Sequence, residues 1–227
     1  MRFRARKWIV ASQVALSLIL LVAAGLLLRS FAKLATLDIG FDRNNVLLVS
    51  TNLKTAKVPL DRQLATCEQI ESRLSTLPGV ISVGRSVMTP ISGFEWNSFI
   101  HTDWSKAITG DKALTYFNYV SPGYFQTLRM SLLAGPNFTS ADTQTAPPVA
   151  IVNQTLALRF FPNLNPVGKT FRIDDVGGKA GPPIEVLGVI KDSKYESLRE
   201  ETYPTAFFPA SQVPAHAEAE ASSCARR

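Results

Sequence analysis

A run of 21 uncharged, mostly apolar residues near the N-terminus, WIVASQVALSLILLVAAGLLL at 8–28, constrains this chain more than any other feature. As a helix, with a rise of about 1.5 Å per residue, the run spans roughly 30 Å, the thickness of a bilayer core. The alternative is a secretory signal peptide, whose apolar region is usually about 7–15 residues long and ends at a cleavage site of small residues. Here the run continues past Ala23-Ala24-Gly25 into three leucines. We therefore expect an uncleaved transmembrane helix over 8–28.

The charge of the chain is concentrated around this run. The formal net charge is +6, from 24 Lys and Arg against 18 Asp and Glu, and residues 1–33 hold six of the basic residues and no acidic one. The rest of the chain therefore holds 24 − 6 = 18 basic residues against 18 acidic ones, which argues against a nucleic-acid partner. Four of these six basic residues precede the run, and basic residues that flank a membrane helix favour its cytoplasmic side. We therefore expect 1–7 to be cytoplasmic and the chain after residue 28 to lie on the other side of the membrane.

Strand-like and helix-like segments alternate after residue 44, which predicts an α+β fold. Apolar residues recur every three or four positions from Leu60 to Leu77, which is typical of an amphipathic helix and places Cys67 on its apolar face. We expect shorter helices at 122–128 and 154–161. Strands are expected at 46–53, 80–88, 113–120, 148–153, 168–173 and 184–190.

Ser121 ends an aromatic strand-like run in a sharp Ser-Pro-Gly turn, where it could be a nucleophile or a helix cap. A nucleophile needs a neighbouring base, the chain has only the histidines His101 and His216, and no G-x-S-x-G pattern surrounds the serine. Serine is a preferred N-cap, and proline is favoured at the first helical position. We therefore expect Ser121 to cap a helix whose Phe125 and Leu128 face the core.

Other sequence patterns give no catalytic, cofactor or metal site. NLNPVGKT at 163–170 lacks the first glycine of a phosphate-binding loop and follows a helix rather than a strand. The histidines and cysteines are too few and too widely spaced for a metal cluster. Cys67 is expected to be a buried core thiol, and nothing favours a bridge to Cys224. We predict no enzymatic activity and no cofactor.

Several stretches, taken in order, resemble one family. They are QVALSLILLVAAGLLLRSFAKLATLDIGFDRNNVLLV, LPGVISVG, YVSPGYFQTLRMSLLAGPNFTSAD, PPVAIVNQTLALRFFPNLNPVGKTFRI and EVLGVIKDSKYESLREETYPTAFFP. Together they are similar to the first membrane helix, stalk and periplasmic core domain of MacB/FtsX-type ABC transporter permeases, nearest to the MacB-like permeases of acidobacteria. The resemblance covers roughly residues 8–210.

The resemblance implies a stalk at 29–44 and a periplasmic core domain at 45–210, built of βαβ units with a smaller, mostly-β insertion. It also implies a single-pass protein of the bacterial inner membrane whose ectodomain is periplasmic. In this family a cytoplasmic ABC ATPase drives the permease, which passes the motion outward (mechanotransmission) during efflux or export. The expected partners are this ATPase, the lipid bilayer around 8–28, permease subunits in a homodimer or heterodimer, and a periplasmic protein.

The sequence departs from the family near Ala210, where an Ala-, Glu- and Ser-rich stretch begins. We expect 211–227 to be a disordered or aberrant tail, and the chain to be a shortened permease component without the family's later membrane helices. The alternative is a single-pass periplasmic binding or sensor protein without transport activity. A third hypothesis, an anchored hydrolase, lacks a base–nucleophile pair.

Overall fold

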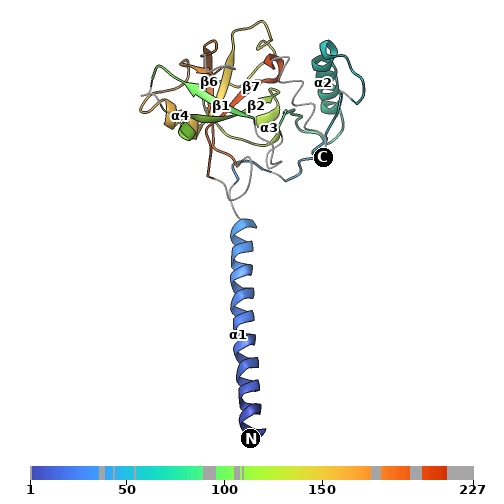
Figure 1. Ribbon diagram of the computed structural model, residues 1–227. Helices are drawn as coiled ribbons and strands as arrows, with labels where there is room; N and C mark the ends of the chain where they lie inside the picture. The colour runs from blue at the N-terminus through green and yellow to red at the C-terminus, as the bar shows by residue number, and fades with distance from the viewer. Residues whose placement is uncertain are drawn as a thin grey trace. The chain divides into compact units, whose positions relative to one another are not determined.

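The computed structural model describes residues 2–35, 39–42, 44–53, 55–88, 96–104, 108, 110–174, 180–194 and 201–213. The chain forms two compact units, at 1–38 and 39–227, which are described separately. The first unit is helix α1 (Arg2–Ala35), drawn in blue in Figure 1. Its segment Lys7–Leu34 is long and apolar enough to cross a membrane, which agrees with the helix predicted over 8–28.

The second unit is a seven-stranded mixed sheet with helices around it (Figure 1). The strand order is β3-β6-β4-β7-β2-β1-β5, and β5 also pairs with β6, so six strands close into a ring with β3 added beside β6. The pairs β2–β7 and β4–β6 are parallel, and the others are antiparallel. The strands are β1 Asn97–His101, β2 Leu114–Val120, β3 Leu132–Ala134, β4 Val149–Asn153, β5 Thr170–Ile173, β6 Ile184–Ile190 and β7 Thr205–Pro209. The helices are α2 Leu60–Ser75, α3 Tyr124–Thr127 and α4 Gln154–Phe160, with 3₁₀ turns η1 Gly110–Ala113 and η2 Ala210–Gln212.

The central strands are buried on both faces. On β7, Ala206 and Phe208 belong to one apolar cluster and Phe207 to another, because successive side chains of a strand point to opposite faces. Helix α4 adds Leu156 and Phe160 to the first cluster, and α3 packs on the second. This double burial explains why β4 and β7 read as continuous apolar runs rather than alternating ones.

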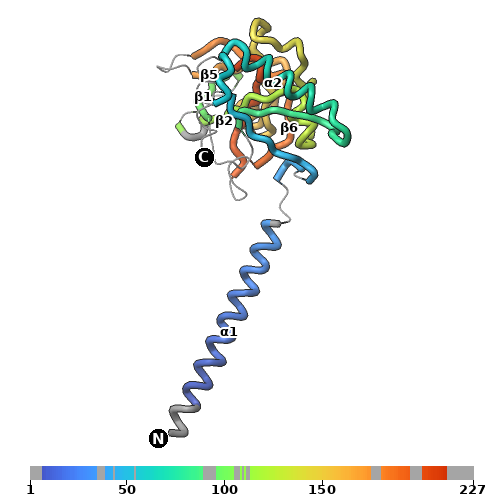
Figure 2. The backbone as a smooth tube through the Cα atoms, turned by 90° about the vertical axis from the view of Figure 1, so that its right-hand side faces the viewer, coloured from blue at the N-terminus to red at the C-terminus, as the bar shows by residue number. Residues whose placement is uncertain are grey.

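Most of the predicted elements are confirmed. Helix α2 forms within the predicted 60–77, and α4 forms within 154–161. The predicted strands at 113–120, 148–153, 168–173 and 184–190 correspond to β2, β4, β5 and β6. Strands β1, β3 and β7 were not identified from the sequence; Figure 2 shows β5, β1 and β2 side by side, as their pairing requires.

The strands predicted at 46–53 and 80–88 are wrong. Neither segment belongs to the sheet, and within 80–88 only Ser86 forms a bridge, to Val120. Residues 85–87 lie beside the end of β2, where the Val87 N–H donates to the Tyr119 carbonyl and the Ser121 N–H donates to the Arg85 carbonyl, both at 2.9 Å, and the pairing extends no further. A β-prone composition makes a strand only where a neighbouring strand supplies hydrogen bonds, and the described residues supply no partner strand for 46–53. Helix α2 lies between these segments, and none of its described side chains is buried. Cys67 is therefore half-buried rather than a core thiol, and a bridge to Cys224 lies outside the described residues.

The segment predicted as a tail from 211 is ordered at its start. Val213 is buried, the Ser211 hydroxyl donates to the carbonyl of Asp142, and the Gln212 side chain donates to the carbonyl of Pro147 at 3.1 Å. Residues 214–227 lie outside the described part of the chain.

Candidate functional site

The first residues of the second unit are fastened to two loops of the sheet. The Asp42 N–H donates to the Leu128 carbonyl at 2.9 Å, and the Lys194 N–H donates to the Ile39 carbonyl at 2.9 Å. Arg129 Nη1 lies 2.7 Å from Asp42 Oδ2. We call Ile39–Asp42, together with Leu128, Arg129, Asp192 and Lys194, the entry clasp, because the chain enters the domain here.

Gly40 allows the backbone at residue 40 to lie against the backbone at residue 192. Its φ of +82° lies in the left-handed region, and a β-carbon there would lie 2.1 Å from the Asp192 carbonyl oxygen. No side chain fits at that distance, so the backbones of residues 40 and 192 meet only because residue 40 is glycine. On either side of it, Ile39 is buried and Phe41 packs against the second apolar cluster. The clasp is therefore anchored by packing as well as by hydrogen bonds.

Asp42 is the residue of the clasp that forms an ion pair with Arg129. The backbone N–H of Asn44, which donates to Asp42 Oδ1 at 2.8 Å, is the largest effect that lowers the pKa of this carboxyl group. The positive charge of Arg129 lowers the pKa further, and desolvation opposes both effects. The carboxylate is thus ionised at neutral pH and available to Arg129, although the exposed position makes the pair a weak one.

The clasp continues into the start of helix α4 through Asp192. Its Oδ1 accepts the Thr155 N–H at 2.9 Å, and its Oδ2 accepts the Thr155 hydroxyl at 2.8 Å. Beside it, Asn153 caps α4, since its Oδ1 accepts the Leu156 N–H at 2.9 Å. The same oxygen accepts the Thr205 N–H at 2.9 Å, so Asn153 also ties β4 to β7.

A second junction joins the segment after α2 to the sheet, and we call it the sheet joint. The Arg85 N–H donates to Ser121 Oγ, and the Ser121 N–H donates to the Arg85 carbonyl, both at 2.9 Å. The buried Asn118 accepts the Met88 N–H at 3.0 Å and donates to the Met88 carbonyl at 2.9 Å. Arg85 Nε also reaches Glu71 of α2 at 2.6 Å, so the joint includes α2.

The predicted capping role of Ser121 is wrong. The cap position of α3 is Gly123, with no side-chain hydrogen bond, and the Ser121 hydroxyl is used by Arg85 instead. The backbone closes the turn alone, through the Tyr124 N–H to the Ser121 carbonyl at 3.0 Å. The predicted packing is confirmed for Phe125, which is buried, while Leu128 is half-buried against the same cluster.

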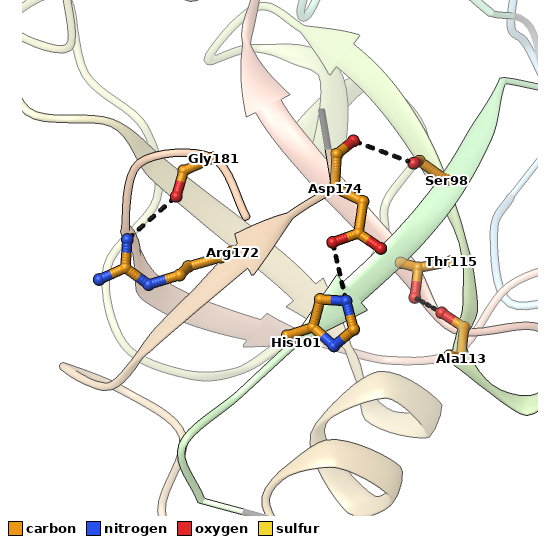
Figure 3. Close-up of polar contacts among 7 residues, drawn as sticks. All are labelled: Ser98, His101, Ala113, Thr115, Arg172, Asp174 and Gly181. Atoms are coloured by element: carbon orange, nitrogen blue, oxygen red, sulfur yellow. Dashed lines mark hydrogen bonds and ion pairs between the residues drawn. The ribbon is translucent and has the colours of Figure 1, made fainter. Parts of the chain in front are cut away.

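The structure pairs His101 with an acid rather than with Ser121 (Figure 3). His101 Nε2, at the end of β1, lies 2.7 Å from Asp174 Oδ1, just beyond β5. The nearby Ser98 hydroxyl donates to the Asp174 backbone carbonyl at 3.4 Å, so it is not aligned with the imidazole as a nucleophile would be. The pair ties two antiparallel strands together. His216 lies outside the described residues, and within the described part no cluster of three or more His, Cys, Asp or Glu could hold a metal ion.

Comparison with known protein families gives a match over residues 9–224 to the MacB-like periplasmic core domain. The chain belongs to this family. The MacB-like match takes in the apolar helix α1 from residue 9 onwards, the whole entry clasp and the sheet joint. A search of curated proteins found no match.

Solved structures similar to this MacB-like domain include three transporter domains. The periplasmic region of MacB from Actinobacillus actinomycetemcomitans is 19% identical, with a TM-score of 0.45, over 64% of this chain and 56% of that one. The extracellular domain of the ABC-type transporter YknZ from Gram-positive bacteria is 19% identical, with a TM-score of 0.40, over 63% and 62%. A permease domain from Porphyromonas gingivalis is 17% identical, with a TM-score of 0.41, over 64% and 58%. This chain thus spans less than two thirds of the length of each of these three solved chains.

Sequence reasoning missed both junctions of the MacB-like domain. Asp42 and Arg129 are 87 positions apart, and Arg85 and Ser121 are 36 apart, so no local pattern links them. The one local signal for the clasp is Gly40, which interrupts the apolar spacing between the helix and the domain. That signal marks a turn, but it does not say which loop the turn contacts.

Proposed function

We infer that this chain is a membrane-anchored permease component of a MacB/FtsX-type ABC transporter, and that its core domain passes ATPase-driven motion outward during efflux or export. It performs no catalysis of its own. Its partners are a cytoplasmic ABC ATPase, permease subunits in a homodimer or heterodimer, and a periplasmic protein. The N-terminus lies in the cytoplasm, α1 crosses the inner membrane, and residues from 39 onwards are periplasmic. The family membership and the basic residues before α1 support this proposal.

The observation that carries the proposal is the entry clasp. A displacement of the first residues of a domain moves its sheet only where those residues are fixed to the sheet. Here Ile39 is buried, and Ile39–Asp42 are fixed by two backbone hydrogen bonds, one ion pair and a direct backbone contact at Gly40. A displacement that reaches Ile39 is therefore applied to the sheet itself.

A topology experiment tests the proposed orientation. Alkaline phosphatase, which is active only after export, is fused after Val213 of the full chain, and a fluorescent protein that matures only in the cytoplasm is fused before Met1. We expect both reporters to be active and the chain to stay in the membrane fraction at full length. An inactive phosphatase fusion would contradict the periplasmic domain, and release of a shortened chain would show that α1 is a cleaved signal peptide.

A force experiment tests the mechanical role of the clasp. Handles are attached to cysteines introduced at Ser30 and Thr145, and the chain is pulled with optical tweezers. We expect residues 39–42 to detach in a first step before the sheet unfolds, and we expect Gly40→Ala and Arg129→Ala to lower the force of that step alone. Arg73→Ala, an exposed arginine on α2, is the control. A force curve without a separate first step, or one unchanged by Gly40→Ala, would contradict the proposal.

A further inference from the structure

Helix α2 and the turns beside it lie to one side of the sheet (Figure 1). Although α2 has sixteen residues, none of its described side chains is buried. Helix α4, with only seven residues, buries Leu156, Ala157 and Phe160. Neither apolar cluster contains a described residue from 55–82. We call residues 55–82 the α2 flap, and its attachment to the sheet therefore depends on contacts outside both apolar clusters.

The α2 flap begins and ends at local turns. At its start the Ala56 N–H donates to the Asn52 carbonyl at 3.2 Å, and the Val58 N–H donates to the Leu53 carbonyl at 3.0 Å. Near its end Gly79 has a φ of +86°, and a β-carbon there would meet no atom within 4 Å. Turns of this kind absorb changes of backbone angle at hinges, so the flap can move without breaking a pair of strands.

One ion pair joins the α2 flap to the sheet joint among the described residues. Arg85 Nε lies 2.6 Å from Glu71 Oε1, and the two side chains are only 24% and 23% exposed, so water and salt screen their attraction incompletely. The backbone of Arg85 is bonded to Ser121 in both directions. One partner of the pair thus belongs to the flap and the other to the sheet.

The apolar side of α2 contributes less than a core helix would. Leu64, Cys67, Ile70 and Leu74 are all half-buried, and the free energy gained by burial scales with the apolar area removed from water. A separate helix of about 16 residues is marginal in water, so α2 needs the rest of the domain to stay folded. The ion pair is therefore a large part of what holds the flap in place.

We propose that the α2 flap opens as one unit while the ring of strands stays closed, and that Glu71 and Arg85 form the catch that holds it shut. Opening separates these two side chains and uncovers the half-buried side of α2, but it leaves the hydrogen bonds between Arg85 and Ser121 in place. The inference goes beyond the proposed function and does not depend on it, because it follows from contacts within one domain.

Hydrogen exchange of the full chain in detergent micelles, measured by mass spectrometry, tests the opening itself. Peptides covering 60–75 report on α2, and peptides covering 149–160 report on β4 and α4. After correction for intrinsic rates, we expect the amides of α2 to exchange at least about a hundredfold faster than those of β4. Equal protection of α2 and β4 would overturn the proposal, because α2 would then open only when the whole domain unfolds.

The replacement Glu71→Gln tests the catch, because it removes the charge and keeps the shape of the side chain. Glu68→Gln is the matched control, since it removes the same charge from an exposed position of the same helix. We expect Glu71→Gln to speed the exchange of α2 at least about fivefold and to leave β4 unchanged, whereas Glu68→Gln changes neither. Equal effects of the two replacements, or equal acceleration of α2 and β4, would refute the catch.

The replacement Arg85→Gln shows whether the two side chains act as a pair. The backbone of residue 85, which bonds to Ser121, is unchanged by it, so only the side chain is tested. We expect the addition of Glu71→Gln to Arg85→Gln to speed the exchange of α2 by less than about twofold further, because the pair is already broken. Two independent effects that multiply would show that the side chains do not act together and would overturn the catch.

Discussion

The replacement of Gly123 by alanine tests whether the sheet joint depends on direct contact between two backbones. Gly123 has an ordinary φ of −77°, so alanine is not excluded by conformation. A β-carbon at this position would, however, lie 2.0 Å from the Val83 carbonyl oxygen. The approach is reciprocal, since a β-carbon at Gly84 would lie 2.5 Å from the Cα of Tyr124. Both obstacles are backbone atoms, which cannot rotate away as a side chain can.

The size of the effect follows from these distances. Real β-carbons essentially never approach another heavy atom closer than 3.0 Å, so the two backbones must separate by about 1 Å. That shift stretches the pair of 2.9 Å hydrogen bonds between Arg85 and Ser121 beyond bonding range. Overpacking costs about 1–3 kcal/mol, and two lost hydrogen bonds cost about 0.5–1.5 kcal/mol each. We therefore expect Gly123→Ala to lower the free energy of unfolding by about 2–6 kcal/mol.

Denaturant unfolding of the full chain in detergent, followed by tryptophan fluorescence, measures this loss. Gly168→Ala is the matched control, because Gly168 has a positive φ of +78° and nothing within 4 Å of its added β-carbon. That variant should lose only about 1 kcal/mol, from backbone strain. A Gly123→Ala variant that is as stable as Gly168→Ala would refute the backbone contact. Faster hydrogen exchange at the Arg85 amide in Gly123→Ala would locate the damage at the joint.

Three further changes probe the domain. Asn153→Ala leaves the buried N–H groups of Leu156 and Thr205 without acceptors and should cost about 2–4 kcal/mol in a thermal melt, whereas Asn153→Asp keeps both acceptors and should cost less. Folding lowers the pKa of Asp42, so the ionised carboxyl group stabilises the folded state above its unfolded pKa of 3.8, and this contribution is lost as the pH falls through the folded pKa. The melting temperatures of Asp42→Asn and the parent chain should therefore converge in acid. Burial raises the pKa of Tyr119, so the folded state is destabilised once the pH rises above the unfolded value of 10.0, and Tyr119→Phe should remove that alkaline loss, measured by the pH dependence of the melt.

The elements that could be predicted from the sequence are those whose signals are local. Strand β4 and helix α4 follow each other as a continuous apolar run, an asparagine cap and a terminating proline, and each of these acts within a few residues. Strand β6 is a similar apolar run between turn residues. In these segments the local sequence favours the same conformation that packing in the folded domain requires, so prediction and structure agree.

The errors occur where a distant residue decides the outcome. Ser121 has every local feature of a helix cap, but its hydroxyl accepts a hydrogen bond from the backbone N–H of Arg85 instead of from the helix. The close approach of the two backbones at Gly123 brings that N–H into range. Val46–Leu53 has the composition of a strand, yet pairing is a property of two segments, and the described residues provide no second one. Gly40 could be recognised as a turn, but its contact with Asp192 depends on how the sheet is assembled.

The two junctions of the domain meet on the same short helix. The sheet joint fastens α3 at its start, through Ser121 and Gly123, and the entry clasp fastens it at its end, through Leu128 and Arg129. Between them Tyr124 and Phe125 pack on Phe207 of β7, with ring centroids 6.3 and 5.2 Å away. A rigid single turn held at both ends cannot move at one end only, because close-packed cores shift as units rather than deform continuously. The entry clasp and the sheet joint are therefore connected through α3, by a route that does not cross the whole sheet. Among the described elements, α3 is thus the one that the two junctions share, with the backbone contact of Gly123 just before it and the ion pair of Arg129 just after it.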